Sequence, residues 1–224
     1  SRAVPMLVLR SMKEYAGDER KLKEMFQVTL NALRTRQKSD GGFALYSPQY
    51  ESSSQVAVSL YAAHFLIEAK SKGLAVPEDI LGRVKAYLQT ESVRISGGNL
   101  SSVRRWAFAL YLSARLGVVN GASLAQLKRE LEKDFKDQWE GDIAALYLAG
   151  TYALYRQEEI GEKLIKSFKI SESVVTDLED YLDPLNRNSV LLYMAGKHYP
   201  SRVKDLITPE NLRILMKPIN SGSA

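Results

Sequence analysis

Two histidines, His64 and His198, are the first candidates for chemistry in this sequence. Histidine titrates near neutral pH and can activate an acyl group for transfer to a nucleophile. His64 lies between Tyr61 and Phe65 in a helical pattern, which favours a packed position between helices over a catalytic one. His198 precedes a Tyr-Pro pair, so we expect it at a helix end, where the helix dipole favours positive charge. The sequence therefore predicts no catalytic histidine.

The sequence gives little support for a metal site, a thiol nucleophile or nucleotide hydrolysis. The chain of 224 residues contains no Cys, which excludes disulfides, thiolate metal sites and a thiol nucleophile within it. The two histidines lack the spacing of paired metal ligands, and no Gly-rich loop is followed by Lys-Ser or Lys-Thr. We therefore expect neither a metal nor a cofactor.

A run of acidic residues near position 180 is the next candidate. These residues are Asp177, Glu179, Asp180 and Asp183. Asp-rich motifs protonate substrates or hold magnesium diphosphate in terpene cyclases, but here the acids alternate with Leu and Tyr as in a capped, solvated short helix. Glycoside hydrolysis needs two carboxylates across a groove lined with aromatics, and no acid stands out for that role in the sequence. Trp106 and Trp139 are expected to pack rather than to form a sugar platform.

The charge and hydropathy of the sequence argue against a nucleic-acid-binding protein and against a membrane span in this chain. The net charge is +5, from 31 basic and 26 acidic residues that are mixed along the chain. No basic stripe with interleaved aromatics appears, so no nucleic-acid partner is expected. No apolar run approaches the roughly 20 residues that span a bilayer, and no signal peptide is visible. The chain opens on Ser1 instead of Met, so we expect it to be part of a longer protein.

Apolar residues recur at helical spacing almost everywhere, and no segment alternates as a strand does. Mostly apolar segments alternate with charged, one-faced segments. The apolar ones are 55–72, 102–116 and 142–156, and the one-faced ones are 78–91, 123–135 and 157–169. This is a repeated helical hairpin of about 40 residues with an inner and an outer helix. We predict an all-α fold, an α/α toroid of about ten or eleven helices.

Caps and breakers mark the remaining boundaries. The predicted domain is a single one over residues 1–217, with residues 218–224 as a flexible tail. The further expected helices are 4–15 before Gly17, a second one capped by Asp18, a short one at 177–182, one at 183–200 capped by Asp183, and one at 208–217. One of Ser52, Ser53 and Ser54 is expected to cap the helix at 55–72.

The connection Asp40-Gly41-Gly42 is followed by three large apolar residues, Phe43, Leu45 and Tyr46. Glycine permits the positive φ of a tight turn, after which these side chains are expected to fold back on the helix ends. The spacing Gln37-x-x-x-Gly41-x-Phe43 resembles the Gln-x-x-x-Gly-x-Trp repeat of terpene cyclases and related α/α toroids. That resemblance implies that Gln37 ties helix ends together while the aromatic ring packs between repeats.

A longer resemblance covers residues 33–88, which are similar to the thioester-domain region of bacterial alpha-2-macroglobulins. The shared features are the Gln-x-x-Asp-Gly-Gly-Phe loop, a helix of the type Tyr-x-x-x-Phe-Leu-x-Glu-Ala beginning at Tyr61, and Gly-x-x-Val-Pro ending at Pro77. Residues 56–58 read Val-Ala-Val and depart from the Trp-Leu-Thr that this family often has before the Tyr. Residues 104–127 and 183–200 also resemble the family's later hairpins.

This resemblance implies a module of a protease-trapping inhibitor with a host-defence-like role, and it implies a scaffold rather than an enzyme. The implied partners are the other domains of the parent protein and target proteases, in the periplasm or at the cell envelope. The segment from Ser1 to Met6 resembles the residues just after the family's reactive Cys-x-Glu-Gln motif. Either the sequence begins just past that motif or the parent lacks a thioester.

The alternative function is an (α/α) toroid enzyme acting on polysaccharide or isoprenoid substrates. The two possibilities predict different interiors. An enzyme of this class needs a deep central cavity with converging carboxylates, whereas the macroglobulin-type domain is expected to fill its centre with the apolar faces of the inner helices.

Overall fold

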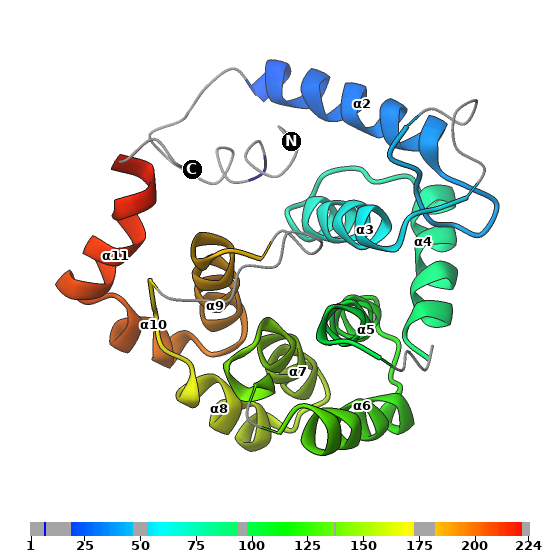
Figure 1. The fold of residues 1–224 in the computed structure, drawn as a ribbon. Helices are drawn as coiled ribbons and strands as arrows, with labels where there is room; N and C mark the ends of the chain where they lie inside the picture. The colour runs from blue at the N-terminus through cyan, green and yellow to red at the C-terminus, as the bar shows by residue number, and fades with distance from the viewer. Residues whose placement is uncertain are drawn as a thin grey trace. The chain divides into compact units, whose positions relative to one another are not determined.

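The computed structural model describes residues 7, 19–46, 53–93, 98–136, 138–172 and 182–220. Within these ranges the chain forms α-helices α2 to α11 and one short 3-10 turn, η2, and no residue lies in a β-strand (Figure 1). The predicted all-α class, built from helical hairpins of the α/α-toroid type, is confirmed. The chain divides into two compact units, Ser1–Glu91 and Ser92–Ala224, called unit 1 and unit 2 below.

Unit 1 contains α2 (Glu19–Arg36), α3 (Val56–Ser71) and α4 (Glu78–Glu91). The helix α3 is buried around most of its circumference, with Leu66 fully buried and Leu60 only 1% exposed. In contrast, α2 buries only Phe26 and Leu30 among its side chains, so it covers the unit with one face. The predicted difference between apolar and one-faced helices is therefore present in this unit.

Unit 2 repeats the same alternation over more helices. Its inner helices are α5 (Leu100–Arg115), α7 (Ile143–Leu154) and α9 (Pro184–His198), and α7 packs against both of the others. Its outer elements are α6 (Gly121–Asp134), η2 (Trp139–Gly141), α8 (Glu158–Ser167), α10 (Pro200–Leu206) and α11 (Pro209–Asn220). Residues Ile143 to Tyr152 of α7 are all buried, as a central helix requires (Figure 1).

Several predicted helix ends need correction. The sequence predicts no helix at α10 and places Pro200 at the end of the preceding helix. In the structure Pro200 occupies the first turn of a new helix, where its missing N–H is harmless. The helix α11 continues to Asn220, past the predicted end at 217. The predicted helices at 4–15 and 177–182, and the Asp18 cap, lie outside the described residues apart from Leu7, which is buried, and Leu182, which precedes α9.

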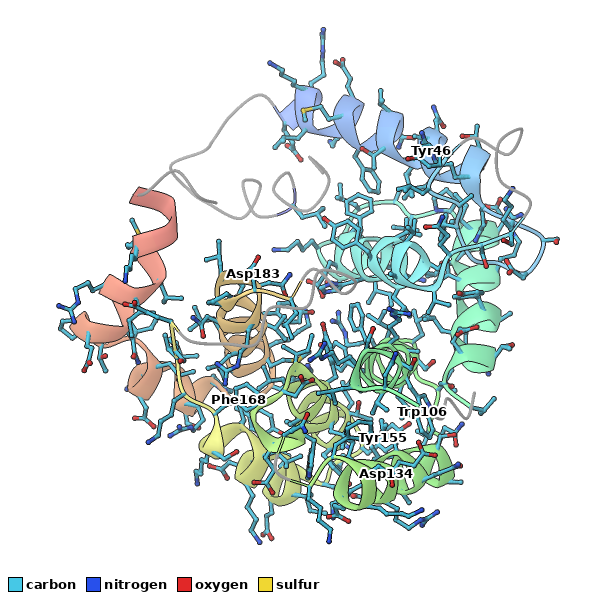
Figure 2. The ribbon with its side chains drawn as sticks, viewed as in Figure 1. Tyr46, Trp106, Asp134, Tyr155, Phe168 and Asp183 are labelled. Atoms are coloured by element: carbon cyan, nitrogen blue, oxygen red, sulfur yellow. The ribbon has the colours of Figure 1, made fainter. Side chains whose placement is uncertain are left out.

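Asparagine and aspartate caps set the starts of four unit 2 helices, α5, α6, α7 and α9. Asn99 accepts a hydrogen bond from the Ser102 amide, so α5 begins at Leu100, two residues before the predicted start. Asp183 accepts from the Asn186 amide at 2.7 Å and Pro184 begins α9, as predicted (Figure 2). Among the described residues, no helix is both long enough and apolar enough to cross a membrane.

Candidate functional site

The glycine–aromatic corner, residues 37–43, closes the end of α2 in unit 1. The Gln37 side-chain amide donates to the Gly41 carbonyl and to the Ile80 carbonyl of α4, both at 3.1 Å. Gln37 and Phe43 also form an isolated antiparallel bridge. A single amide group thus holds the turn closed and joins it to a helix 43 residues further along the chain. The predicted tie between helix ends is confirmed.

Gly41 is required by both its backbone angle and its surroundings. Its φ is +89°, and a Cβ atom at this position would lie 2.2 Å from the Arg83 carbonyl oxygen. An L-residue is disfavoured at such a φ, and backbone atoms of α4 cannot move aside cheaply. Asp40 completes the turn, because its carboxylate accepts from the Gly42 amide at 2.9 Å and from the Ser54 hydroxyl at 2.7 Å.

Phe43 connects the corner to α3. Its side chain is 1% exposed, and its amide donates to the Ser59 hydroxyl oxygen at 2.7 Å. The Gln55 amide in turn donates to the Phe43 carbonyl at 2.9 Å. The two backbone groups of Phe43 are therefore satisfied by the first turn of α3 and by the residue before it, which positions the ring between helices as predicted.

Two expectations about this corner are wrong. Leu45 and Tyr46 do not fold back, since they are 48% and 60% exposed. Figure 2 labels Tyr46. The buried side chains of this segment are Phe43 and Ala44, each 1% exposed. The predicted serine cap of α3 is also absent among the described residues, because Gln55 is the N-cap without a side-chain bond and Ser54 pairs with Asp40 instead.

Unit 2 joins two of its helices by a buried ion pair, whereas the corner of unit 1 reaches α3 and α4 through neutral hydrogen bonds. Arg104 of α5 contacts Asp142 with its Nε at 2.8 Å and its Nη2 at 2.7 Å, and both side chains are 6% exposed. Asp142 also caps α7 by accepting from the Ala144 amide at 3.0 Å. The carboxylate therefore joins the start of α7 to the first turns of α5.

Arg187 extends this junction to α9. Its guanidinium donates to the Lys169 carbonyl at 2.9 Å and to the Gly141 carbonyl at 3.2 Å, and it lies 4.4 Å from the centroid of the Phe168 ring. Burial lowers the pKa of the Arg187 guanidinium, and the nearby Asp142 carboxylate opposes that change. The three inner helices of unit 2 are thus linked near their N-terminal ends.

A polar cluster links α5 and α9 again near their C-terminal ends. It consists of Tyr111, Arg115, Tyr193 and His198. The Tyr111 hydroxyl lies 2.9 Å from Nε2 of His198, and Arg115 donates to the Tyr193 hydroxyl at 2.9 Å and to the Tyr111 hydroxyl at 3.3 Å. His198 is the last residue of α9, so its predicted place at a helix end is confirmed. The sequence did not predict its contact with Tyr111.

The other candidates from the sequence do not converge on one site. Trp106 is buried and donates to the Ser92 carbonyl at 2.7 Å, and Trp139 is 4% exposed, so both pack as predicted (Figure 2). His64 is half-buried on α3. Asp177, Glu179 and Asp180 lie outside the described residues. Within the described ranges, no group of three or more acidic or histidine side chains is placed to hold a metal ion.

An open groove of about 650 Å³ lies beside α6 in unit 2. It is lined by Gly98, Val103, Gln126, Arg129, Glu130, Lys133, Asp134 and Phe135. Its two cationic and two acidic side chains balance, and Lys133 pairs with Asp134 at 3.9 Å. This groove therefore gives no preference for a ligand of either charge.

The sequence and fold of this chain were compared with those of known proteins. No family model matches the chain. It is 30% identical to an alpha-2-macroglobulin of Rickettsia conorii over 188 residues, which cover 84% of this chain and 10% of that protein. It is 29% identical to an alpha-2-macroglobulin homolog of Yersinia pestis over 214 residues, or 92% of this chain and 10% of that protein. The chain thus spans about a tenth of the length of these curated relatives.

Solved structures agree on the fold. A mutant Salmonella alpha-2-macroglobulin matches 99% of this chain with a TM-score of 0.71 and 17% identity, and the match covers 15% of that chain. Native Escherichia coli alpha-2-macroglobulin, from domain MG7 to its C-terminus, matches 90% of this chain with a TM-score of 0.68 and 19% identity, over 31% of that chain. The chain has the fold of a helical segment of these proteins. The predicted resemblance to bacterial alpha-2-macroglobulins is confirmed over most of the chain.

Proposed function

We propose that this chain is the thioester-domain-like module of an alpha-2-macroglobulin-type protease inhibitor. The observation that carries the proposal is the sequence relationship, which extends over 84% of the chain in one curated relative and 92% in another. The agreement in fold supports the same assignment. Because the relatives are about ten times longer, protease trapping is proposed for the parent protein, with this chain as one of its parts.

Within that protein the proposed role is a scaffold and interaction surface rather than a catalyst. The contacts described above support this role, because they join one helix of the chain to another. Gln37 bonds to a backbone carbonyl of α4, and the Phe43 amide bonds to the Ser59 hydroxyl of α3. The buried pair of Arg104 and Asp142 joins α5 to α7. Groups held in this way are suited to keeping a rigid shape while the parent rearranges.

Covalent capture of a protease would require chemistry outside this sequence. A thioester needs a Cys, and the chain contains none. The proposed module therefore either follows a Cys-x-Glu-Gln motif in its parent or belongs to a thioester-less parent that traps without a covalent bond. We propose a periplasmic or cell-envelope location, with the other domains of the parent and target proteases as partners.

The parent polypeptide tests this function. It is incubated with a panel of endopeptidases, and cleavage of a large protein substrate is compared with cleavage of a short peptide substrate. A trapped protease is expected to lose activity on the large substrate while it still cleaves the short one, because a steric cage excludes only large molecules. Protease that stays attached in SDS indicates a thioester in the parent. Full cleavage of the large substrate across the panel would overturn the proposal.

A further inference from the structure

The outer helix α11 carries an apolar stripe that unit 2 leaves partly uncovered. Leu212 and Met216 are one turn apart and therefore lie on the same face of the helix. They are 45% and 46% exposed. Leu215 is half-buried beside them. This set of three side chains is called the α11 stripe.

The outer helix α6 buries its apolar stripe, and α8 buries one apolar side chain deeply while Ile160 is 42% exposed. In α6, Leu124, Leu127 and Leu131 are at most 4% exposed, and Ile165 of α8 is 1% exposed. None of the described side chains of α11 reaches that degree of burial. The helix is nevertheless held in place, because Asn211 donates to the Leu206 carbonyl at 2.9 Å and Lys217 pairs with Glu172. An anchored helix with an uncovered stripe indicates a surface that another group covers.

The charge beside the stripe limits what that group can be. Arg213 is exposed and lies three residues before Met216, so it borders the stripe on the same helix. It forms no ion pair or hydrogen bond with the residues that the structure describes. A complementary surface is therefore apolar at its centre, with a carboxylate opposite Arg213.

We propose that the α11 stripe docks against an adjoining domain of the same polypeptide, through an apolar patch with an acidic flank. The proposal rests on the proposed function, because it needs the longer parent that the relatives have. Two or three half-exposed side chains are far fewer than the roughly 20 residues a side of a stable protein–protein interface, so a second copy of the chain is a poor occupant. A tethered domain needs less area, because its effective concentration is already in the millimolar range.

Hydrogen exchange of α11 tests the proposal on the chain of 224 residues and on the parent polypeptide. The α11 amides are expected to exchange about tenfold more slowly in the parent, which corresponds to about 1.4 kcal/mol. The double variant Leu212→Ser/Met216→Ser in the parent is expected to abolish that difference. The matched control is Val119→Ser, which changes a lone apolar side chain that is 75% exposed and lies before α6.

Equal exchange of α11 in the two proteins would overturn the docking proposal. So would slower exchange in the isolated chain at higher protein concentration, since that result identifies a second copy as the occupant. The protease assay on the same parent separates this proposal from the proposed function. Capture without protection of α11 removes only the docking surface, and protection without capture removes only the inhibitor role.

Discussion

The two units join neighbouring helices by different chemistry. In unit 1 the corner at Gln37 to Phe43 reaches α4 and α3 through neutral groups, namely one side-chain amide and one serine hydroxyl, while the Asp40 carboxylate bonds to the Gly42 amide and the Ser54 hydroxyl. In unit 2 the buried ion pair of Arg104 and Asp142 joins α5 to the start of α7. A neutral junction loses one hydrogen bond when a partner is removed, whereas an ionic one leaves an uncompensated charge in the interior. We therefore expect the two units to respond very differently to single substitutions.

The largest loss in the free energy of unfolding is expected for substitution of Asp142. Asp142→Ala removes the carboxylate that faces Arg104 and also the cap of α7, and breaking a buried pair from one side costs about 3–5 kcal/mol. The free energy of unfolding is measured in urea by tryptophan fluorescence, because Trp106 and Trp139 are the two tryptophans of the chain and both lie in unit 2.

Two further variants separate the charge from the cap. Asp142→Asn keeps a capping side chain and is expected to recover only the cap contribution of about 1 kcal/mol. The double variant Arg104→Met/Asp142→Leu removes both charges and is expected to recover most of the loss. A loss below about 1 kcal/mol for Asp142→Ala would show that the ion pair is not the main junction of unit 2.

The second largest effect is expected at Gly41. In Gly41→Ala, the new Cβ meets both the unfavourable φ and the Arg83 carbonyl, so a loss of about 3 kcal/mol is expected. The matched control is Gly73→Ala, where φ is +76° but no atom lies within 4 Å of the added Cβ. That variant is expected to lose only about 1 kcal/mol. Urea unfolding followed by far-UV circular dichroism compares them, and equal losses would argue against the tight approach of the corner to α4.

Ser59 is expected to have a smaller effect. Ser59→Ala removes the acceptor for the buried Phe43 amide, and an unsatisfied buried donor costs about 1–3 kcal/mol. Ser71→Ala is the control, since its hydroxyl bonds to the Glu68 carbonyl at an exposed position and should change stability by less than about 0.5 kcal/mol. The same unfolding measurement applies. Equal effects of the two serines would mean that water or a shifted loop replaces the lost acceptor at Phe43.

These two junctions also differ in how far the sequence predicted them. The turn at Gly41 was predictable because glycine pairs act locally. The resemblance to toroid repeats implied that Gln37 ties helix ends together, although it did not name α4 as the partner. The pair of Arg104 and Asp142 was not, because its members lie 38 residues apart among 57 charged side chains of both signs. Asp142 precedes a long apolar run, which predicts a helix cap but not its partner.

Features that depend on neighbouring residues were predicted from the sequence, whereas features that depend on residues far apart in the chain were not. Helix periodicity predicted most of the described helices, whereas seven-residue α10 is too short for a periodic signal. The contact of His198 with Tyr111 spans 87 residues and depends on how α5 packs against α9. Phe43 is buried while Leu45 and Tyr46 are exposed, and the bonds of Phe43 to Ser59 and Gln55 are between residues 12 or more positions apart, which composition does not encode.

The last prediction concerns Tyr199 of unit 2. Its ionisation is expected to leave the free energy of unfolding unchanged at neutral pH and to lower it at alkaline pH. Its hydroxyl donates to the Ala149 carbonyl at 2.7 Å, and burial raises its pKa far above the ordinary value of 10.0, with a further contribution from Glu158. The folded state therefore keeps this proton while the unfolded chain loses it above about pH 10. The resulting stability is fully present below pH 10 and is lost as the pH rises from there towards the folded-state pKa.

Burial also raises the pKa of Tyr152 and Tyr155 in unit 2 and of Tyr87 in unit 1. The free energy of unfolding, measured by circular dichroism in urea, should be constant up to about pH 9 as far as these groups are concerned and should fall above pH 10. Tyr199→Phe should reduce that slope by about 1.4 kcal/mol per pH unit, because one fewer proton is released on unfolding. An unchanged slope would mean that the Tyr199 hydroxyl reaches water in the folded chain, and the packing of α9 and α10 against α7 would need revision.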